Sequence, residues 1–401
     1  MHIACTHVDL LRVLALLKRA IKETTDLPIL SHVLLEVEQG EARLSANNLE
    51  IGITCELVAT GAVEGAVSVP WRRLADLVEH LPQGASAHRR RAGAASIEME
   101  TSEGSHALSV RSGRSRAVIY GMHASEFPTV PRPGPGAARD GLSLRLSSGL
   151  LAAMVHKVAF AAATSEKPNP ILTGILLHAS GSLLTISARD AHRLAACEAP
   201  LAAAVPRECA AVLRAGLAAE CAHVLASVAP ATPVQLVIEE QRVQVSFLLP
   251  GIVLSSRLDV GNYPMGFRQH VKPNYLTRVV VETKGLAAAL KSLAQVAGDG
   301  GDLVTLTFSV SSDSKGVVAV GAQSQDLGGQ TEEVDAVSLE GEAGDQLLLK
   351  YSQMAQVMAV LDAPYLALEK RGSTDPVAVR PVGGDASLQE TYVLVPCVRK
   401  E

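Results

Sequence analysis

A serine, an aspartate and a histidine lie close together in the middle of the chain, at Ser187, Asp190 and His192. These side-chain types supply the nucleophile, the orienting acid and the general base of many hydrolases. Asp190 and His192 are two residues apart, so on a strand they would share one side. No nucleophile-elbow motif surrounds the serine, however. We therefore favour a structural pair or the lining of a binding pocket, and keep a hydrolase as an alternative hypothesis.

Other motifs with possible chemistry are incomplete. The glycines at 134 and 136 have no preceding strand or following helix, so a dinucleotide-binding loop is not predicted. Residues 299–302 lack the rest of a calcium loop. The six cysteines contain no CxxC pair and are interpreted as reduced thiols, without a zinc site. We expect neither a metal nor a cofactor.

Pairs of cations recur seven residues apart on three segments with helical periodicity. The segments are 8–22, 207–217 and 285–297, and a spacing of seven residues places both cations on one helix face. A solvated helix face is the ordinary explanation, as it is for the charge run at 88–91. Recurrence in three segments, with few acidic residues on those faces, instead favours contact with a polyanion through its phosphates. The pairs are Arg12 with Arg19, Arg207 with Arg214, and Lys284 with Lys291.

The amino-acid composition excludes some classes of nucleic-acid-binding protein. The chain has 401 residues, a formal net charge of −5 and 48% hydrophobic residues. Aromatic residues are 3% of the chain, which excludes a single-strand binder built on stacking platforms. The charge excludes a strongly basic coat protein but not a local basic surface. Without an 18-residue apolar run or a signal-like N-terminus, we expect a cytoplasmic protein that does not enter membranes.

The predicted helices and strands, which must position these residues, recur in the same order along the chain. Pro/Gly-rich stretches at 126–136 and 261–266 predict two linkers, and they divide the chain into three parts of about 130 residues. Each part begins with a short strand and a helix, continues with alternating hairpin patterns, and contains a second helix. The predicted fold class is α+β. The predicted helices are 8–22, 71–81, 148–163, 207–217, 285–297 and 351–361, with Thr6, Ser147 and Thr283 as N-caps of the first helix in each part.

Several segments resemble one family, the bacterial DNA polymerase III beta subunit or beta sliding clamp. They are residues 27–30 with 47–51, 111–116 followed by 126–128, 190–195, and 392–397. Each is weak to moderate alone, but their order and spacing cover essentially the whole chain. The resemblance implies three repeated DNA-clamp domains at 1–131, 140–264 and 272–401, each with two helices packed on antiparallel sheets. It also implies a head-to-tail dimeric ring.

The resemblance further implies a function without catalysis. The ring would encircle double-stranded DNA independently of sequence and tether the replicative polymerase as a processivity factor in DNA replication. The implied partners are a second copy of the chain, the polymerase III alpha subunit, the clamp loader delta subunit and other clamp-motif proteins. No cofactor is implied.

Candidate site residues follow from the resemblance and the helix faces. A peptide-binding pocket would be lined by Arg189, His192, Arg193, Leu194, Pro264, Val271, Val393, Val395, Pro396 and Cys397. The DNA-facing cations would be Arg12, Arg19, Lys22, Arg72, Arg207, Arg214, Lys284 and Lys291. The dimer interface would use Ala117, Ile119, Leu293 and Val296.

Departures from the family pattern leave two alternatives open. Arg189 stands where a small hydroxyl residue is usual, and Ala117 is small where an aromatic residue would seal the dimer. A diverged paralogue that acts mainly as a protein-interaction platform is therefore an alternative function. Leu293 is equally well explained as an internal core residue.

Overall fold

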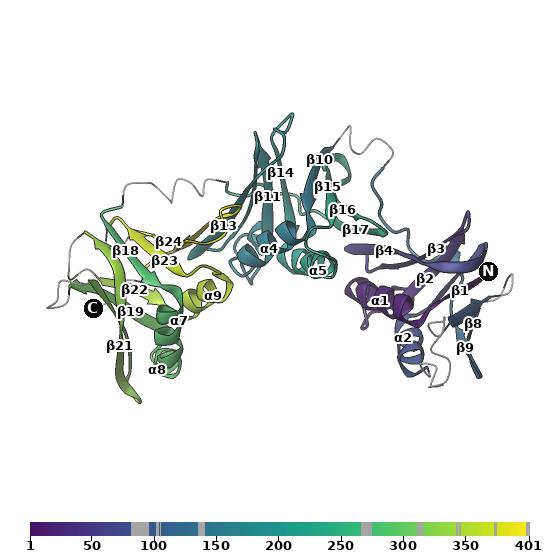
Figure 1. The fold of residues 1–401 in the computed structure, drawn as a ribbon, viewed down its shortest axis with the longest axis horizontal. Helices are drawn as coiled ribbons and strands as arrows, with labels where there is room; N and C mark the ends of the chain where they lie inside the picture. The colour runs from purple at the N-terminus through teal and green to yellow at the C-terminus, as the bar shows by residue number, and fades with distance from the viewer. Residues whose placement is uncertain are drawn as a thin grey trace, which may run out of the picture. The chain divides into compact units, whose positions relative to one another are not determined.

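The computed structural model describes residues 1–81, 96–101, 104, 106–134, 141–265, 275–310, 316–341, 344, 346–372 and 375–397. Figure 1 labels the helices and strands along the chain. Residue contacts divide the chain into two compact units. Unit 1 contains Met1–Leu151 and Glu220–Leu258, and unit 2 contains Ala152–Ala219 and Asp259–Glu401. This division differs from the three predicted domains, whose boundaries stay a prediction.

Unit 1 holds two antiparallel sheets. In spatial order, the five-stranded sheet is β5 (Ala59–Val63), β1 (His2–Thr6), β7 (Ser96–Glu100), β8 (Ala107–Ser112) and β9 (Ser115–Tyr120). The eight-stranded sheet is β10 (Leu142–Ser147), β15 (Pro233–Glu239), β16 (Gln244–Leu249), β17 (Ile252–Arg257), β4 (Ile51–Leu57), β3 (Glu41–Asn47), β2 (His32–Glu38) and β6 (Gly65–Pro70). Strands β2 and β3 pair as a hairpin, as the alternating pattern in the first part of the chain predicts.

Two helices of unit 1 bury their apolar faces together. Helix α1 (His7–Leu17) continues as a 3-10 turn at Lys18–Ala20, and α2 is Trp71–His80. The Thr6 hydroxyl accepts the backbone N–H of Asp9 at 3.1 Å, which confirms the predicted N-cap. The indole N–H of Trp71 donates to the Leu14 carbonyl at 2.9 Å, and this bond ties the two helices together.

Unit 2 is organised around one twelve-stranded antiparallel sheet. Its spatial order is β14 (Cys209–Arg214), β11 (Gly174–Ser180), β12 (Leu183–Arg189), β13 (Arg193–Pro200), β25 (Gln389–Leu394), β24 (Val377–Val382), β23 (Tyr365–Lys370), β18 (Thr277–Glu282), β21 (Gly328–Glu340), β20 (Gly316–Ser324), β19 (Leu303–Val310) and β22 (Gln346–Lys350). Its helices are α7 (Thr283–Ser292), α8 (Ala294–Asp299) and α9 (Tyr351–Val360). Helices α4 (Ser148–Ala159) and α5 (Ala215–Ala226) run across the boundaries that define the units. No helix in the described ranges is long and apolar enough to cross a membrane.

The predicted helix at 207–217 is wrong. Residues 209–214 form strand β14, which pairs with β11 through Ile175 opposite Leu213, and helix α5 begins only at Ala215. A short run of apolar residues is compatible with either a strand or a helix. Here the pairing with β11 in the sheet makes the segment a strand. Arg207 therefore precedes the strand and Arg214 ends it, so they do not share a helix face.

The predicted dimer residues are partly core residues of the monomer. Leu293 is 0% exposed, between α7 and α8, and Ile119 on β9 is 8% exposed. Ala117 and Val296 are half-buried. Leu293 and Ile119 present almost no surface to a partner chain, and the internal-core interpretation of Leu293 is the one that the structure supports.

The buried side chain of His32 should make the protein less stable to unfolding in mild acid. Its ring is 6% exposed in β2, and Nδ1 lies 3.0 Å from the Ser68 hydroxyl. Burial lowers the pKa of His32 from the usual 6.5, and a hydrogen bond to the Ser68 backbone raises it by less. The unfolded chain therefore binds a proton at a pH where the folded chain does not, so stability falls as the pH drops below 6.5.

The His32→Gln variant measures this contribution. Urea unfolding between pH 7 and 5 should give a slope shallower by up to about 1.4 kcal/mol per pH unit, the value for one proton. An unchanged slope in His32→Gln would show that this histidine is not the group that titrates.

Candidate functional site

Two small apolar clusters lie on the sheet of unit 2. One cluster joins the turn before β11, strands β11 and β14, and the segment after β17. Its members are Ile171, Leu176, Val212 and Tyr263, with Leu172 packed against them. The second cluster, on β13 and β25, contains Leu194, Ala196 and Val393.

Strand register places both clusters on one face. Residues directly opposite each other in neighbouring strands project to the same side of a sheet. One row across the sheet runs from Val212 to Leu176, Ser187 and Ala196. The next row runs from Arg189 to Leu194 and Val393. Arg189 is thus the cation that β12 places on the face shared by the two clusters.

Arg189 has a close neighbour in Tyr263. Burial raises the pKa of the Tyr263 hydroxyl to about 12, although the positive charge and the backbone of Arg189 act in the opposite direction. The tyrosine is 6% exposed, and its hydroxyl stays neutral at physiological pH. It is therefore a hydrogen-bonding group rather than an acid or a base.

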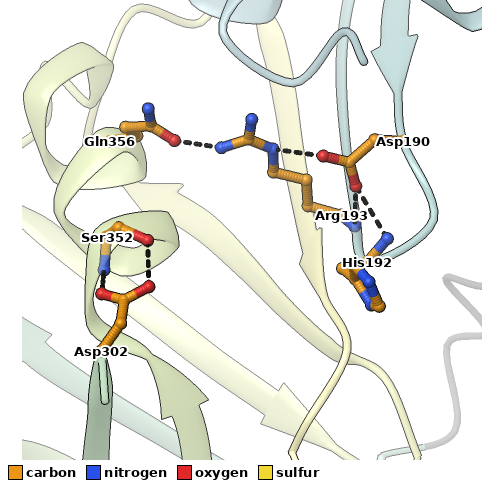
Figure 2. A network of polar contacts seen from close by, with 6 residues as sticks. All are labelled: Asp190, His192, Arg193, Asp302, Ser352 and Gln356. Atoms are coloured by element: carbon orange, nitrogen blue, oxygen red, sulfur yellow. Dashed lines mark hydrogen bonds and ion pairs between the residues drawn. The ribbon is translucent and has the colours of Figure 1, made fainter. Parts of the chain in front are cut away.

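Asp190 organises the turn between β12 and β13 (Figure 2). Its Oδ1 accepts the backbone N–H groups of His192 at 2.7 Å and Arg193 at 2.9 Å. Its Oδ2 accepts Nε of Arg193 at 3.0 Å. The carboxylate is thus engaged by the backbone of His192 and by Arg193, and the geometry supports a structural role rather than the orientation of a catalytic imidazole.

Arg193 ties this turn to helix α9. Its guanidinium also donates to the Gln356 side chain (Figure 2). The same guanidinium lies 5.6 Å from the ring centre of Phe160. Asp302 fixes the start of the same helix, because it accepts the Ser352 backbone N–H at 2.8 Å and the Ser352 hydroxyl at 2.5 Å. Arg193 alternates with Leu194 along β13, so it projects to the opposite face from the apolar clusters.

The remaining predicted pocket residues surround this region. The backbone N–H of Val395 donates to the His192 carbonyl at 2.9 Å, and that of Cys397 donates to Leu348 at 2.8 Å. Pro396 is buried, whereas Val395, His192 and Pro264 are exposed. Val271 lies outside the described residues. Peptide binding by this set stays a prediction.

The predicted DNA-facing cations are on surfaces of both units. In unit 1, Arg19 pairs with Glu220 at 3.2 Å, and in unit 2, Arg214 pairs with Asp259 at 3.2 Å. For the other cations of α1, α2 and α7, no carboxylate partner occurs among the described residues. All eight cations are exposed: Arg12, Arg19, Lys22, Arg72, Arg207, Arg214, Lys284 and Lys291.

Three of the cysteines lack the environment of reactive thiols. Burial raises the pKa of Cys5, Cys55 and Cys197 to about 12 in each case, so these thiols stay protonated and weakly nucleophilic. Within the described ranges, no group of three or more His, Cys, Asp or Glu residues is arranged to hold a metal ion.

Comparison with known proteins identifies the family. The model of the N-terminal domain of the DNA polymerase III beta subunit matches residues 1–131, and that of the central domain matches residues 145–265. Together these matches cover more than half of the chain. The chain belongs to the family of DNA polymerase III beta subunits, the beta sliding clamps.

Related clamps match over nearly the full chain. The beta sliding clamp of Synechocystis sp. is 28% identical and that of Synechococcus elongatus 26% identical, each over 99% of both chains. The crystal structure of the Bacillus subtilis clamp covers 100% of both chains, with a TM-score of 0.86 and 22% identity. A Pseudomonas aeruginosa clamp bound to griselimycin gives a TM-score of 0.86 at 23% identity.

These findings confirm the predicted family, the α+β clamp fold and the role of a non-catalytic DNA sliding clamp in replication. The hydrolase hypothesis has no support. None of the comparisons favours the alternative of a diverged paralogue.

Sequence reasoning missed several residues of this clamp. Tyr263 lies in the predicted linker at 261–266, and Gln356 was not among the predicted site residues. The buried ion pair between Lys157 on α4 and Glu390 on β25, with Nζ 2.8 Å from Oε1, was also missed. A lysine within the otherwise apolar helix sequence SGLLAAMVHKVA was the available signal, because such a charge needs a partner when it is buried.

Proposed function

We propose that two copies of this clamp close head to tail into a ring around duplex DNA. The DNA would pass through without its sequence being read, and the ring would tether a polymerase through a peptide bound on the sheet of unit 2. One observation supports closure of the ring. The chain pairs strands of neighbouring predicted domains in the same way twice, and two further strand edges are available for a third pairing of this kind.

In each of these two joints, the last strand of one predicted domain pairs with an earlier strand of the preceding domain. Within unit 1, β17 pairs antiparallel with β4 through Leu254 opposite Ile53. Within unit 2, β25 pairs antiparallel with β13 through Val393 opposite Leu194. A third joint of this type would use the last strand of the first predicted domain and an inner strand of the third.

Those two strands are β9 and β21. Strand β9 ends its sheet and pairs only with β8 in the described part of the chain. Strand β21 pairs with β20 over residues 328–335, and β18 covers its other edge only from Ala336 onward. Unpaired backbone groups on such edges are templates for another strand. Val118 and Tyr120 on β9 are 54% and 82% exposed, which leaves apolar surface beside that edge.

Charge on the two edges is complementary. Strand β9 and its turn carry the exposed cations Arg114 and Arg116, whereas β21 carries the exposed acids Glu333 and Asp335. Two β9 edges would repel each other, as would two β21 edges, so the charges favour contact between unlike edges. A contact between unlike surfaces builds a ring when its rotation closes.

Exposed cations on α1, α2 and α7 support contact with DNA phosphates. Such contacts give affinity that depends on salt and not on sequence. The protein is acidic overall, so this attraction would be local, consistent with a clamp that slides. Because Lys22, Arg207 and Arg214 lie outside helices, we assign the main contribution to Arg12, Arg72, Lys284 and Lys291.

The partners proposed for the apolar face are peptides of other replication proteins. Leu194 and Val393 would receive an aliphatic or aromatic anchor, and Val395 and His192 would border it. The polymerase III alpha subunit and the clamp loader delta subunit are the partners that we propose, in the cytoplasm, where the DNA is.

Reversing the charges of one edge tests the ring joint. Arg114→Glu with Arg116→Glu should convert the dimer to a monomer, because four like charges would then meet at each joint. Adding Glu333→Arg and Asp335→Arg should restore the dimer. Sedimentation at micromolar concentration reports the mass, about twice the 42.0 kDa of one chain for the ring.

The parent chain is the control for this experiment. A monomeric parent would favour the interaction platform over the ring. A stable dimer whose mass is insensitive to both charge reversals would show that the joint lies elsewhere.

A further inference from the structure

We propose that residues 129–134 act as an internal ligand that keeps the first joint of the chain closed. The first joint is the pairing of β4 with β17 in unit 1, and the second joint is the pairing of β13 with β25 in unit 2. The segment occupies, at the first joint, the place that corresponds to the candidate peptide site at the second. The inference concerns a strand pairing that the structure shows, so it does not depend on peptide binding or on closure of the ring.

The two joints begin with the same turn chemistry. At the first joint, Oδ1 of Asn48 accepts the backbone N–H groups two and three residues further along, at 3.0 and 2.8 Å. At the second joint, Oδ1 of Asp190 accepts the N–H groups two and three residues further along, at 2.7 and 2.9 Å. Each turn leads directly into the strand that forms the joint, so Gly52 on β4 corresponds to Leu194 on β13. The position that carries an apolar side chain at the second joint therefore carries none at the first.

The linker fills the space that Gly52 leaves. A Cβ atom at position 52 would lie 2.9 Å from Cγ1 of Val130 and 3.0 Å from Cδ of Pro131. A larger residue could not enter without displacing the linker. A glycine within a strand often marks a place where another segment approaches closely. Val130 and Pro131 are half-buried, and they supply the apolar side chains that the strand itself lacks at this position.

Hydrogen bonds attach this segment on both sides of the first joint. Nδ2 of Asn47 on β3 donates to the Thr129 carbonyl at 2.9 Å, and Asn47 is opposite Gly52 in the sheet. Both side-chain positions therefore project to the face that the linker covers. At the other end, the Gly134 N–H donates to Oε1 of the buried Glu239 on β15, at 3.3 Å. In the sheet order, β3 lies on the β4 side of the joint and β15 lies on the β17 side.

A segment attached on both sides should resist separation of the two strands. Opening the first joint would break the two attaching hydrogen bonds or detach one end of the linker, and it would expose the contact of Val130 and Pro131 with Gly52. The linker is part of the same chain, so it is present at a high effective concentration that a free peptide does not match. The first joint should therefore stay closed and occupied, whereas the second remains available to a partner.

Hydrogen–deuterium exchange of the full chain tests the proposal, because it measures the two joints separately. The variant Val130→Ala with Pro131→Ala removes the atoms that rest on Gly52. Backbone amides of β4 and β17 should then exchange about tenfold faster than in the parent protein. Amides of β13 and β25, in the other unit, are the internal control and should exchange at the parent rate. Unchanged exchange at β4 and β17 would overturn the proposal, as would an equal acceleration at both joints.

A substitution on β4 tests the same contact from the other side. Replacing glycine by alanine usually stabilises a protein where the backbone conformation allows it, because the unfolded chain becomes less flexible. Gly52→Ala should instead speed exchange at the first joint, since the added methyl group displaces the linker. Adding Val130→Ala makes room for that methyl group and should slow the exchange again. Slower exchange in Gly52→Ala than in the parent protein would show that the linker does not rest on β4.

The matched control for this substitution is Gly216→Ala on α5. In the described structure, a methyl group at position 216 meets no atom within 4 Å outside its own helix and its chain neighbours. This variant should leave the exchange rates of both joints unchanged.

Discussion

The Glu390→Gln variant is expected to lose about 3–5 kcal/mol in the free energy of unfolding of unit 2, because it leaves a buried ammonium group without its counter-charge. Lys157 and Glu390 are 12% and 7% exposed, with Nζ 2.8 Å from Oε1. The second carboxylate oxygen accepts the Tyr392 hydroxyl at 2.7 Å, and that tyrosine is 1% exposed. An amide at position 390 would keep the volume but not the charge.

Urea unfolding, followed by circular dichroism, measures this loss as a shift of the transition of unit 2. The matched control is the double variant Lys157→Met with Glu390→Leu, which removes both charges and should recover most of the lost stability. A loss below about 1 kcal/mol in Glu390→Gln would place the pair in the range of solvent-exposed ion pairs and contradict its burial.

The same network reaches the candidate peptide site. Lys157 also donates to the Val360 carbonyl at the end of α9, at 3.2 Å. Tyr392 packs against Phe160, and Arg193 lies over the ring of Phe160. Because Tyr392 directly precedes Val393 on β25, Glu390→Gln should also weaken peptide binding.

The second large effect concerns DNA. Reversing the charge of Arg12 on α1 and Lys284 on α7 should strongly reduce retention on nicked circular DNA without changing the fold. Both side chains are exposed, and neither has a carboxylate partner among the described residues. In a dimer, loss of four phosphate contacts would lower the slope of log affinity against log salt by up to roughly 3–4.

A control for this variant is Arg145→Glu with Arg257→Glu, two exposed cations at strand positions of unit 1. This control changes the net charge by the same amount as Arg12→Glu with Lys284→Glu. Its retention on nicked circular DNA should match that of the parent protein. Equal losses in both variants would indicate general repulsion from an acidic protein. Unchanged retention in Arg12→Glu with Lys284→Glu would contradict the assignment of these helix faces to DNA.

The parts of the fold that local signals specify could be predicted from the sequence. Thr6 before an amphipathic stretch marked the start of α1, and its hydroxyl does cap that helix. Alternating segments predicted hairpins, and β11 and β12 form one of them. Gly181 in its turn has a φ of +57°, which glycine adopts without strain. Such features depend on residues within a few positions of each other.

The error at 207–217 shows where local signals are insufficient. Pro206 precedes this segment as Pro70 precedes α2, and the apolar residues 209–213 fit both the helical and the strand periodicity. The pairing of Leu213 with Ile175 in β11 decides between strand and helix, and it depends on residues far apart in the chain. The seven-residue spacing of Arg207 and Arg214 was therefore incidental.

The proximity of Leu194 and Val393 could be predicted from the sequence, but the orientation of Arg193 could not. Leu194 and Val393 were placed in one pocket through the resemblance, and they do form one cluster. Arg193 was expected beside them, yet Asp190 and Gln356 hold its side chain on the other face. Tyr263 and Glu390 depend on contacts between segments more than 70 residues apart, which no spacing rule in one sequence reveals.

Retention on DNA of different topology tests the topological account most directly. The parent protein, placed on nicked circular duplex by a clamp loader with ATP, is separated by gel filtration and then exposed to a restriction enzyme that cuts the circle once. A ring that encloses the duplex stays on the circular DNA and is released once the cut creates free ends, at constant salt and DNA concentration. Equal retention on circular and linear DNA would show that the protein grips the duplex instead of enclosing it.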